Sequence, residues 1–516
     1  MRRWSAIAIL LSCAACAHPR PPVTEPHPSP ADELTAADAD VRAGCLDCLL
    51  SAYARYDALR QTPEVADHAT AGAIRAAALV AMRERELGMV DDGYLEKARA
   101  LAGGPRQVPA WLPRVLEVVD ALPRARDSVG RPPSSDEDIA RARRLRENRD
   151  AWLGVLRGAA EYDEAAAYAW LVFTCDGIDN RTMPSLEIFD GVASFEDAPL
   201  IVYRESRCRA TETRTLESLI DHNPRFVEIA YTLGLAAIGA RPRPKLDEAE
   251  RWLQRAYEWR PRWPALTLAM GGVAMTAEDF DHARTMYEET LAIEPHSGDA
   301  LFGDLRALTY LGAANDAIAV ANRMLDERWM VGDARYWRAF NEMQLDQLET
   351  AWEDVEMAEK TSINAQVPKL AGLIAYRRAQ LDVAIARFST SYERNPLDCE
   401  TRFYLGVVHA EARHWTETAD KLVGAASCLQ DQEAELTQDI ARIRTSALSE
   451  ERKAKQIARR EQQIAEGRRR IATSWFDVAV ADFNLSKKDE ARQYAERVSD
   501  DEQFGERARD LLARLR

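Results

Sequence analysis

The sequence contains no motif that by itself indicates catalysis. It has no glycine-rich phosphate loop, no nucleophile elbow and no zinc-binding helix motif. The alternation of apolar and polar residues that is typical of strands does not persist anywhere in the chain. Positive charge is also in deficit, because 68 lysines and arginines stand against 84 aspartates and glutamates, a net charge of −16. These absences argue against an enzyme, a β-rich fold and a general surface for nucleic acid or anionic lipid.

A long apolar run is missing as well, and the N-terminal one is short. Residues 1–3 are basic at two positions, residues 4–11 are apolar, and small residues with two cysteines follow. Because eight residues are too few to span a bilayer, we interpret this segment as a secretory signal. Residues 17–33 are rich in proline and are expected to form an extended tether.

A cysteine directly after small residues resembles the lipobox of bacterial lipoproteins, in which the signal is removed before a lipidated cysteine. Cys16 gives the more ordinary signal length, whereas Cys13 has the better upstream residues. Either cysteine is followed by alanine, which in that family implies the outer membrane, on its periplasmic face. The alternative is an ordinary cleaved signal and a soluble periplasmic protein.

A small residue recurs through the second half of the chain at a nearly constant interval. Successive intervals are 34, 34, 34 and 33 residues, at Ala249, Ala283, Ala317, Ala351 and Ala384. Glycine and proline markers repeat at the same period, at Pro261 and Pro295 and at Gly372 and Gly406. A period of 34 is the length of the helix–turn–helix unit of tetratricopeptide repeats.

One copy of the repeat resembles the tetratricopeptide family pattern through Met270, Gly271, Ala283, Tyr287 and Pro295. Gly271 and Ala283 would let neighbouring helices approach, and Tyr287 would fill the space between them. The resemblance implies an all-α fold, a right-handed superhelical solenoid of antiparallel helix hairpins. It also implies a role in binding other proteins rather than in catalysis.

The period and the composition divide the chain into six predicted parts. These are the signal peptide at 1–16, the tether at 17–33, an N-terminal helical region of degenerate repeats at 34–223 with a loop-rich stretch at 174–204, the solenoid at 224–428, a charged insert at 429–473, and a final repeat with a capping helix at 474–516. The insert carries a ladder of apolar residues seven apart, which predicts a long helix or a coiled-coil-like hairpin. It either lies on its own solenoid or extends to a partner.

Six cysteines lie beyond the signal, and an even number in an exported chain fits disulfides. Their order suggests the pairs Cys45–Cys48, Cys175–Cys208 and Cys399–Cys428. In the repeat register Cys399 opens one helix of a hairpin and Cys428 closes the other, so those two ends lie side by side. Cys45 and Cys48 also have the spacing of a thiol–disulfide centre, but no strand precedes them and no βαβ pattern surrounds them.

Two sets of residues are candidates for binding a partner. In tetratricopeptide repeats, roughly the second, fifth, ninth and twelfth residues of each unit line the concave side, and aromatic and charged residues occupy those places here. They are Asp299, Phe302, Arg306, Tyr336, Phe340, Lys369, Tyr376, Glu400 and Phe403. Part of this set would instead be core between repeats. The second set, a group of tryptophans and arginines around Trp259, is interpreted as a joint between units.

The sequence thus predicts a non-enzymatic scaffold or assembly factor of the cell envelope. Its expected partners are envelope proteins and, through the N-terminal lipid, the membrane; no cofactor, metal, nucleic acid or small-molecule substrate is expected. One alternative is a structural subunit of a motility, pilus or secretion complex. An alternative of another class is a thiol–disulfide protein that uses Cys45 and Cys48.

Overall fold

The computed structural model describes residues 28–104, 109, 111–121, 136–175, 197–209, 213–241, 244–446 and 448–515. Within these ranges the chain forms 24 helices and no strand, which confirms the predicted all-α fold. The predicted signal, with Cys13 and Cys16, and most of the tether lie outside the described residues. None of the helices that the structure describes is long and apolar enough to cross a lipid bilayer.

The first half of the described chain is a stack of helices that pack on their neighbours in sequence. The helices are α1 (Pro30–Ala43), α2 (Leu46–Leu59), α3 (Ala66–Leu87), α4 (Tyr94–Ala102), α5 (Leu112–Ala121), α6 (Asp136–Ala160), α7 (Glu164–Cys175), α9 (Pro199–Arg209) and α10 (Thr213–His222). Helix α3 is buried over most of its length, because α2, α4, α5 and α7 all contact it.

Two helices begin earlier than the sequence predicted. Helix α1 begins at Pro30, inside the expected tether, because Ser29 caps it and Asp32 completes a capping box. Helix α9 begins at Pro199, inside the stretch that was expected to be loop-rich. In both cases proline occupies the first turn, where its fixed φ suits a helix and its missing N–H has no partner to lose.

The second half is a regular series of hairpins. The first helices of the units are α11 (Ile229–Gly239), α13 (Pro264–Thr276), α15 (Gly298–Tyr310), α17 (Val331–Gln344), α19 (Gln366–Arg377) and α21 (Cys399–Glu411). The second helices are α12 (Leu246–Trp259), α14 (Phe280–Ile293), α16 (Ala314–Asp326), α18 (Leu348–Glu359), α20 (Leu381–Arg394) and α22 (Trp415–Thr445). The second helices begin every 33 or 34 residues, so the predicted register is confirmed.

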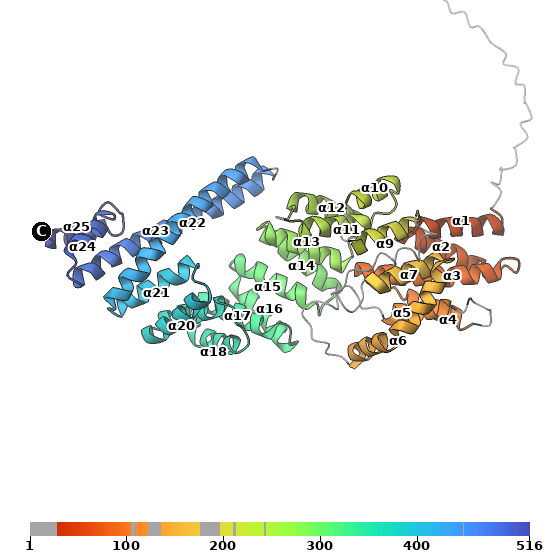
Figure 1. Cartoon of the computed structure of the whole chain (residues 1–516), viewed down its shortest axis with the longest axis horizontal. Coiled ribbons are helices and arrows are strands. Elements are labelled where there is room, and N and C mark those ends of the chain that lie inside the picture. The colour runs from red at the N-terminus through yellow and green to blue at the C-terminus, as the bar shows by residue number, and fades with distance from the viewer. Residues whose placement is uncertain are drawn as a thin grey trace, which may run out of the picture.

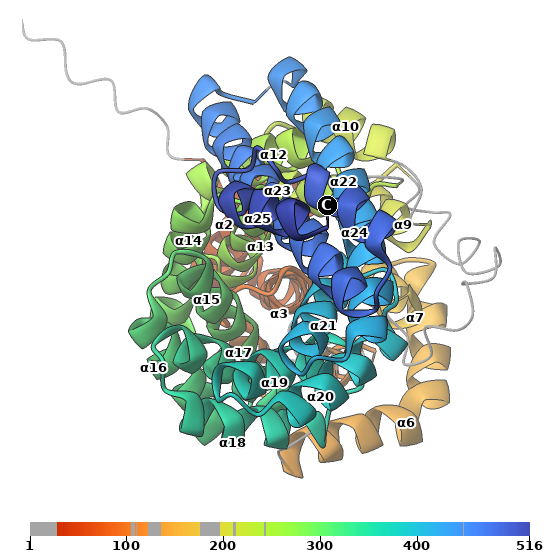
Figure 2. The ribbon, with the colours of Figure 1, turned by 90° about the vertical axis from the view of Figure 1, so that its left-hand side faces the viewer.

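The hairpins form two layers around a curved path (Figures 1 and 2). In Figure 2, α15, α17, α19 and α21 lie nearer the centre of the arc than α14, α16, α18 and α20. The inner layer is also the more closely spaced one, since α13, α15, α17 and α19 each contact the next helix of that layer. The first helices of the units therefore supply the inner face, as the repeat resemblance implied.

Small residues hold the two layers together at the predicted places. A Cβ added to Gly271 would lie 2.6 Å from Cε1 of Tyr287, and one added to Gly303 would lie 2.3 Å from Cζ of the same ring. Gly372 meets Phe388 in the same way, further along the array. The aromatic ring thus fills space that exists only because its neighbours carry no side chain.

The predicted insert is a helical hairpin built from two lengthened repeat helices. Helix α22 continues past Cys428 to Thr445, and α23 (Glu450–Asn484) runs back into the final repeat. Ile440 and Ile443 of the predicted apolar ladder are buried in the seam between the two helices. Helices α24 (Lys488–Glu496) and α25 (Gly505–Arg514) then close the C-terminal end.

Candidate interaction surface

The nine predicted partner-binding residues all lie on inner-layer helices. Asp299, Phe302 and Arg306 belong to α15, and their equivalents 34 residues later in α17 are Asp333, Tyr336 and Phe340. The sequence argument omitted Asp333, although the spacing alone places it beside the chosen residues. Lys369 and Tyr376 belong to α19, and Glu400 and Phe403 to α21.

Aromatic rings form a continuous chain across this part of the solenoid. Phe280 stacks on Tyr310 with ring centroids 4.7 Å apart, and Tyr310 lies 6.0 Å from Trp337. Trp337 in turn contacts Tyr336 at 5.3 Å and Phe340 at 6.0 Å. Tyr310 is half exposed, at 50% of its surface, so the chain is open to solvent along its course. Tyr310 and Trp337 were missed from the sequence because they lie beside the expected concave positions.

Three charged groups border the aromatic chain without ion-pair partners in the part of the chain that the structure describes. They are the carboxylates of Asp299 and Asp333, one repeat apart, and the guanidinium of Arg306, which lies over the Phe302 ring at 5.7 Å. Partial burial raises the pKa of both aspartates. A desolvated carboxylate without a counter-ion favours binding of a cationic group.

The other half of the predicted row is engaged within the chain itself. Lys369 Nζ lies 3.0 Å from Asp398 Oδ2 and 2.5 Å from Glu400 Oε2. Arg470, from α23, reaches the other oxygen of Glu400 at 2.8 Å. Burial acts to lower the pKa of Lys369, but the two carboxylates outweigh it and hold that pKa above its usual value. These charges already satisfy one another.

The two aromatic residues of that half are also occupied. Phe403 is a core residue, 7% exposed, and the guanidinium of Arg470 lies over its ring at 6.0 Å. The hydroxyl of Tyr376 donates a hydrogen bond to Glu411. The accessible part of the predicted row is therefore the set on α15 and α17.

The structure forms the three disulfides in the suggested pairing, Cys45–Cys48, Cys175–Cys208 and Cys399–Cys428. Cys45 caps α2, and its Sγ accepts the backbone N–H of Cys48 at 3.0 Å. Both residues of that pair are only 1% exposed, so neither sulfur is open to attack by another thiol. The burial favours a structural role for this pair over the thiol–disulfide alternative.

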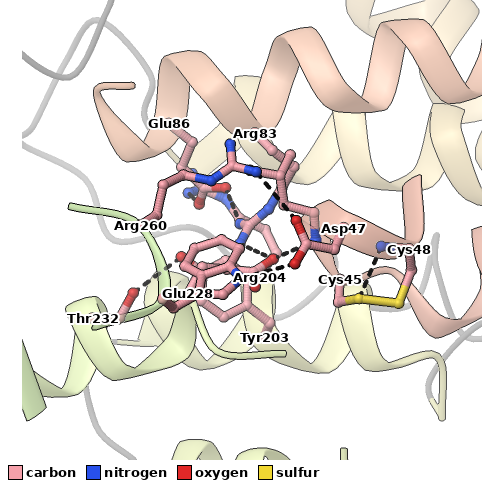
Figure 3. Close-up of polar contacts among 12 residues, drawn as sticks. Cys45, Asp47, Cys48, Arg83, Glu86, Tyr203, Arg204, Glu228, Thr232 and Arg260 are labelled. Carbon is pink, nitrogen blue, oxygen red and sulfur yellow. Dashed lines mark hydrogen bonds and ion pairs between the residues drawn. A yellow bond between two sulfur atoms is a disulfide. The ribbon is translucent and has the colours of Figure 1, made fainter. Parts of the chain in front are cut away.

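Beside this disulfide lies a buried cluster of charges that the sequence did not reveal (Figure 3). Arg83 is completely buried and contacts Glu86 at 2.6 Å and Glu228 at 3.3 Å. Arg204 reaches the second oxygen of Glu86 at 2.6 Å. The Glu228 carboxylate also accepts the backbone N–H of Leu46 at 2.7 Å. Two arginines and two glutamates thus compensate one another where no ligand has access.

The cluster joins helices that are far apart in sequence. Glu86 and Arg83 are on α3, Arg204 is on α9, and Glu228 caps α11, the first repeat helix. Burial acts to raise the pKa of Glu86, but Arg83, Arg204 and Arg207 outweigh it and lower that pKa to about 2. The cluster is a structural joint between the N-terminal stack and the repeats.

The tryptophan group belongs to the same joint. Trp263 is fully buried, and its indole N–H donates to the Leu87 carbonyl at 2.7 Å. The indole N–H of Trp259 donates to Asp47 at 2.8 Å, and Arg260 contacts the same carboxylate at 3.1 Å. The interpretation of these residues as a joint agrees with these contacts.

In the ranges that the structure describes, no group of three or more His, Cys, Asp or Glu side chains is placed to hold a metal ion.

The helix bounds and their spacing decide the type of repeat. The solenoid is of the tetratricopeptide type. No protein-family model matches the sequence, and no curated protein matches it either. Among solved structures it is similar to YrrB, a tetratricopeptide protein with an unusual peptide-binding site, at 16% identity over 34% of this chain and 91% of that one, with a TM-score of 0.29.

Two further solved structures share this similarity. The Cut9–Hcn1 hetero-tetramer of the APC/C is 14% identical over 94% of this chain and 90% of that chain, with a TM-score of 0.36. A tetratricopeptide repeat protein from Parabacteroides merdae is 16% identical over 58% of this chain and 98% of that one, with a TM-score of 0.31. The assignment of the repeats rests on this chain's own helices and spacing.

Proposed function

We propose that this chain is a non-enzymatic scaffold of the bacterial cell envelope that binds a segment of a partner protein on the inner face of α15 and α17. The observation that carries the proposal is the aromatic chain through Tyr310, Trp337 and Phe340 with Asp299 and Arg306 beside it. Aromatic side chains supply most of the energy at protein interfaces, and unpaired charges at their border select the partner.

The chemistry of this face indicates what the partner segment carries. Asp299 and Asp333 are one repeat apart and partly desolvated, so each favours a lysine or arginine of the partner. The rings between them favour an apolar or aromatic side chain. The expected ligand is therefore an extended or helical segment with basic and apolar residues.

An envelope location is the second part of the proposal. Its support is the N-terminal signal-like segment and the three disulfides, which persist in oxidising compartments. Lipid attachment at Cys16, or at Cys13, would hold the chain on the periplasmic face of the outer membrane. Replacing both cysteines with serine is expected to abolish labelling by a radioactive fatty acid and to release the protein into the soluble periplasm. Unchanged labelling in that double variant would contradict the anchor.

The binding face is tested by photo-crosslinking in intact cells. A photoreactive residue at position 306, on the inner face, is expected to yield a specific adduct, and the same residue at position 356, exposed on the outer-layer helix α18, is expected to yield none. Adding Asp299→Lys and Asp333→Lys to the first chain should remove the adduct while the melting temperature stays close to that of the parent. Equal adducts at both positions, or an adduct that survives the two substitutions, would reject the inner-face proposal.

A further inference from the structure

The α22–α23 hairpin connects the end of the solenoid to its beginning. At its base α22 packs on α21, and α23 packs on α21 and α24. At its tip, side chains of α23 contact α12, α14 and the turn between α13 and α14. Figures 1 and 2 show the hairpin passing from the last units towards α12 and α13, so that it closes the open side of the arc.

The contact at the tip consists mainly of ion pairs. Arg452 Nη2 lies 2.8 Å from Oε1 of Glu250 in α12. Arg459 and Arg460 reach the two oxygens of Glu278 at 3.0 and 2.9 Å. Burial acts to raise the pKa of Glu278, but hydrogen bonds from Arg460 and Arg459 outweigh it and hold that pKa below its usual value. The Glu278 carboxylate is therefore ionised at neutral pH.

Two further contacts place the tip over the start of the aromatic chain. The amide nitrogen of Gln456 donates to the carbonyl of Ala277 at 2.8 Å. The guanidinium of Arg459 lies 4.4 Å from the ring centre of Phe280, the first ring of that chain. Arg452 itself lies at the edge of a shallow apolar hollow whose other lining residues are Glu250, Leu253, Met270, Val273, Ala274, Ala277 and His282.

The composition of this contact makes it separable. Its ion pairs are partly exposed, with side-chain exposures between 16% and 38%, so each is weak and is screened by salt. The tip helix and α12–α14 touch through long side chains rather than through close helix packing, so little apolar surface would be exposed on release. The base of the hairpin, in contrast, continues two repeat helices and stays in place.

We propose that the α22–α23 hairpin is a releasable clasp, whose tip closes the superhelix over its inner face by binding Glu250 and Glu278 of the first units. Released, the tip uncovers the ring of Phe280 and opens the side of the arc through which a segment reaches the inner face. Docked again, it encloses the bound segment. The purpose of the clasp rests on the inner-face binding proposed above, but its opening is a property of the free chain.

The opening is measured as a distance in the absence of any partner. Spin labels at Glu451→Cys, in the exposed first turn of α23, and Glu258→Cys, on α12, report whether the tip is docked, because the six cysteines beyond the predicted signal are paired in disulfides. A single short distance is expected at about 0.1 M salt. A second, longer population should grow at about 1 M salt, where the Debye length falls from about 10 Å to about 3 Å. A distance distribution that is the same at both salt concentrations would overturn the proposal.

Charge reversals identify the residues responsible. Glu250→Arg is expected to produce the longer population already at low salt, and adding Arg452→Glu to the same chain is expected to restore part of the short one. Glu433→Arg is the matched control, because Glu433 pairs with Arg468 at 2.6 Å within the hairpin and away from the tip. A short distance that persists in Glu250→Arg, or an equal effect of Glu433→Arg, would show that these ion pairs do not hold the tip.

Access to the inner face is measured with a bulky maleimide. In a chain with the single free cysteine Asp299→Cys, the modification rate is expected to rise several-fold when Glu278→Arg is added. The rate at Glu356→Cys, on the outer layer, should not change. Equal rates at position 299 with and without Glu278→Arg would remove the gating role. The outcome does not depend on a partner, so it separates failure of the clasp from failure of the binding face.

Discussion

Arg452 binds Glu250 across 202 residues of sequence, with Nη2 of the guanidinium 2.8 Å from Oε1 of the carboxylate. The two side chains join the hairpin of the last regular unit to the second helix of the first. An array of repeats normally contacts only its nearest neighbours, so a long-range pair of this kind adds a constraint that the repeats do not supply. It makes the curvature of the solenoid depend on charges at its two ends.

Close packing between the layers predicts opposite effects for two adjacent glycines of α13. Gly271→Ala is expected to destabilise the protein by about 1–3 kcal/mol, because its Cβ would meet the ring of Tyr287. Gly272→Ala should instead stabilise it by roughly 0.5–1 kcal/mol, since no atom lies within 4 Å of that Cβ and alanine is the better helix former. Thermal melting of both variants checks this, and equal shifts would show that the ring does not lock the two helices.

The buried charge cluster predicts a large loss of stability when one partner is removed. Arg83→Met leaves Glu228 and part of Glu86 without a counter-ion in a fully buried site, at a cost of about 3–5 kcal/mol. Arg255→Met, at an exposed arginine over Trp252, is the control and is expected to cost less than about 1 kcal/mol. Denaturant unfolding distinguishes the two, and similar midpoints would mean that the cluster is not a critical joint.

Stability is expected to fall as the pH rises from about 5 to about 8. Burial, with help from Asp92 and Asp91, raises the pKa of Glu84 to about 8, and burial raises those of Glu342 to about 7 and Asp304 to about 6. A carboxyl whose pKa is raised in the folded state binds its proton more tightly there, so its stabilisation is present at low pH and is lost as the pH passes the folded value.

The measurement is the melting temperature across that pH range. Glu84→Gln should flatten the decline, because the amide keeps the neutral form at every pH. A melting temperature that rises between pH 5 and pH 8 in the parent protein would contradict the assignment of these groups. The acidic limb has another origin, since Glu86, with its pKa lowered to about 2, loses its stabilising charge only as the pH falls below about 4.

The disulfides are expected to differ in their resistance to reduction. Cys45 and Cys48 are 1% exposed, whereas Cys399 and Cys428 are partly exposed near the end of their hairpin. A mild reductant should therefore open Cys399–Cys428 in the folded protein well before Cys45–Cys48, as followed by alkylation and peptide mapping. Simultaneous opening of both pairs would indicate that the N-terminal stack unfolds locally before reduction.

The repeats could be predicted from the sequence because their geometry is local. Gly271 and Tyr287 belong to one hairpin, and a period of 34 places the same small and aromatic residues at the same contacts in each unit. The pairing of Cys399 with Cys428 followed from the same register. Two helix starts were still missed, although Ser29 with Asp32 is a capping signature that the sequence does contain.

The binding face was only half predictable. Spacing placed Phe302 and Tyr336 on the inner layer, and the structure leaves that part accessible. The same spacing also selected Lys369 and Glu400, which are engaged by Asp398 and by Arg470 from a helix 70 residues further on. A repeat register describes one unit and its neighbours, so it carries no information about a helix that returns from a distant insert.

The sequence alone determined the helical class, the hairpin register and the cysteine pairing, because each depends on residues within about one repeat of each other. Only the tertiary structure decided which inner-face residues are free, how Arg83 and Glu228 join the two halves, and that the charged hairpin docks on the first units. These depend on contacts between residues 70 to 202 positions apart. Such contacts follow from the curvature of the whole array, which accumulates from small rotations between successive units and leaves no pattern in any single one.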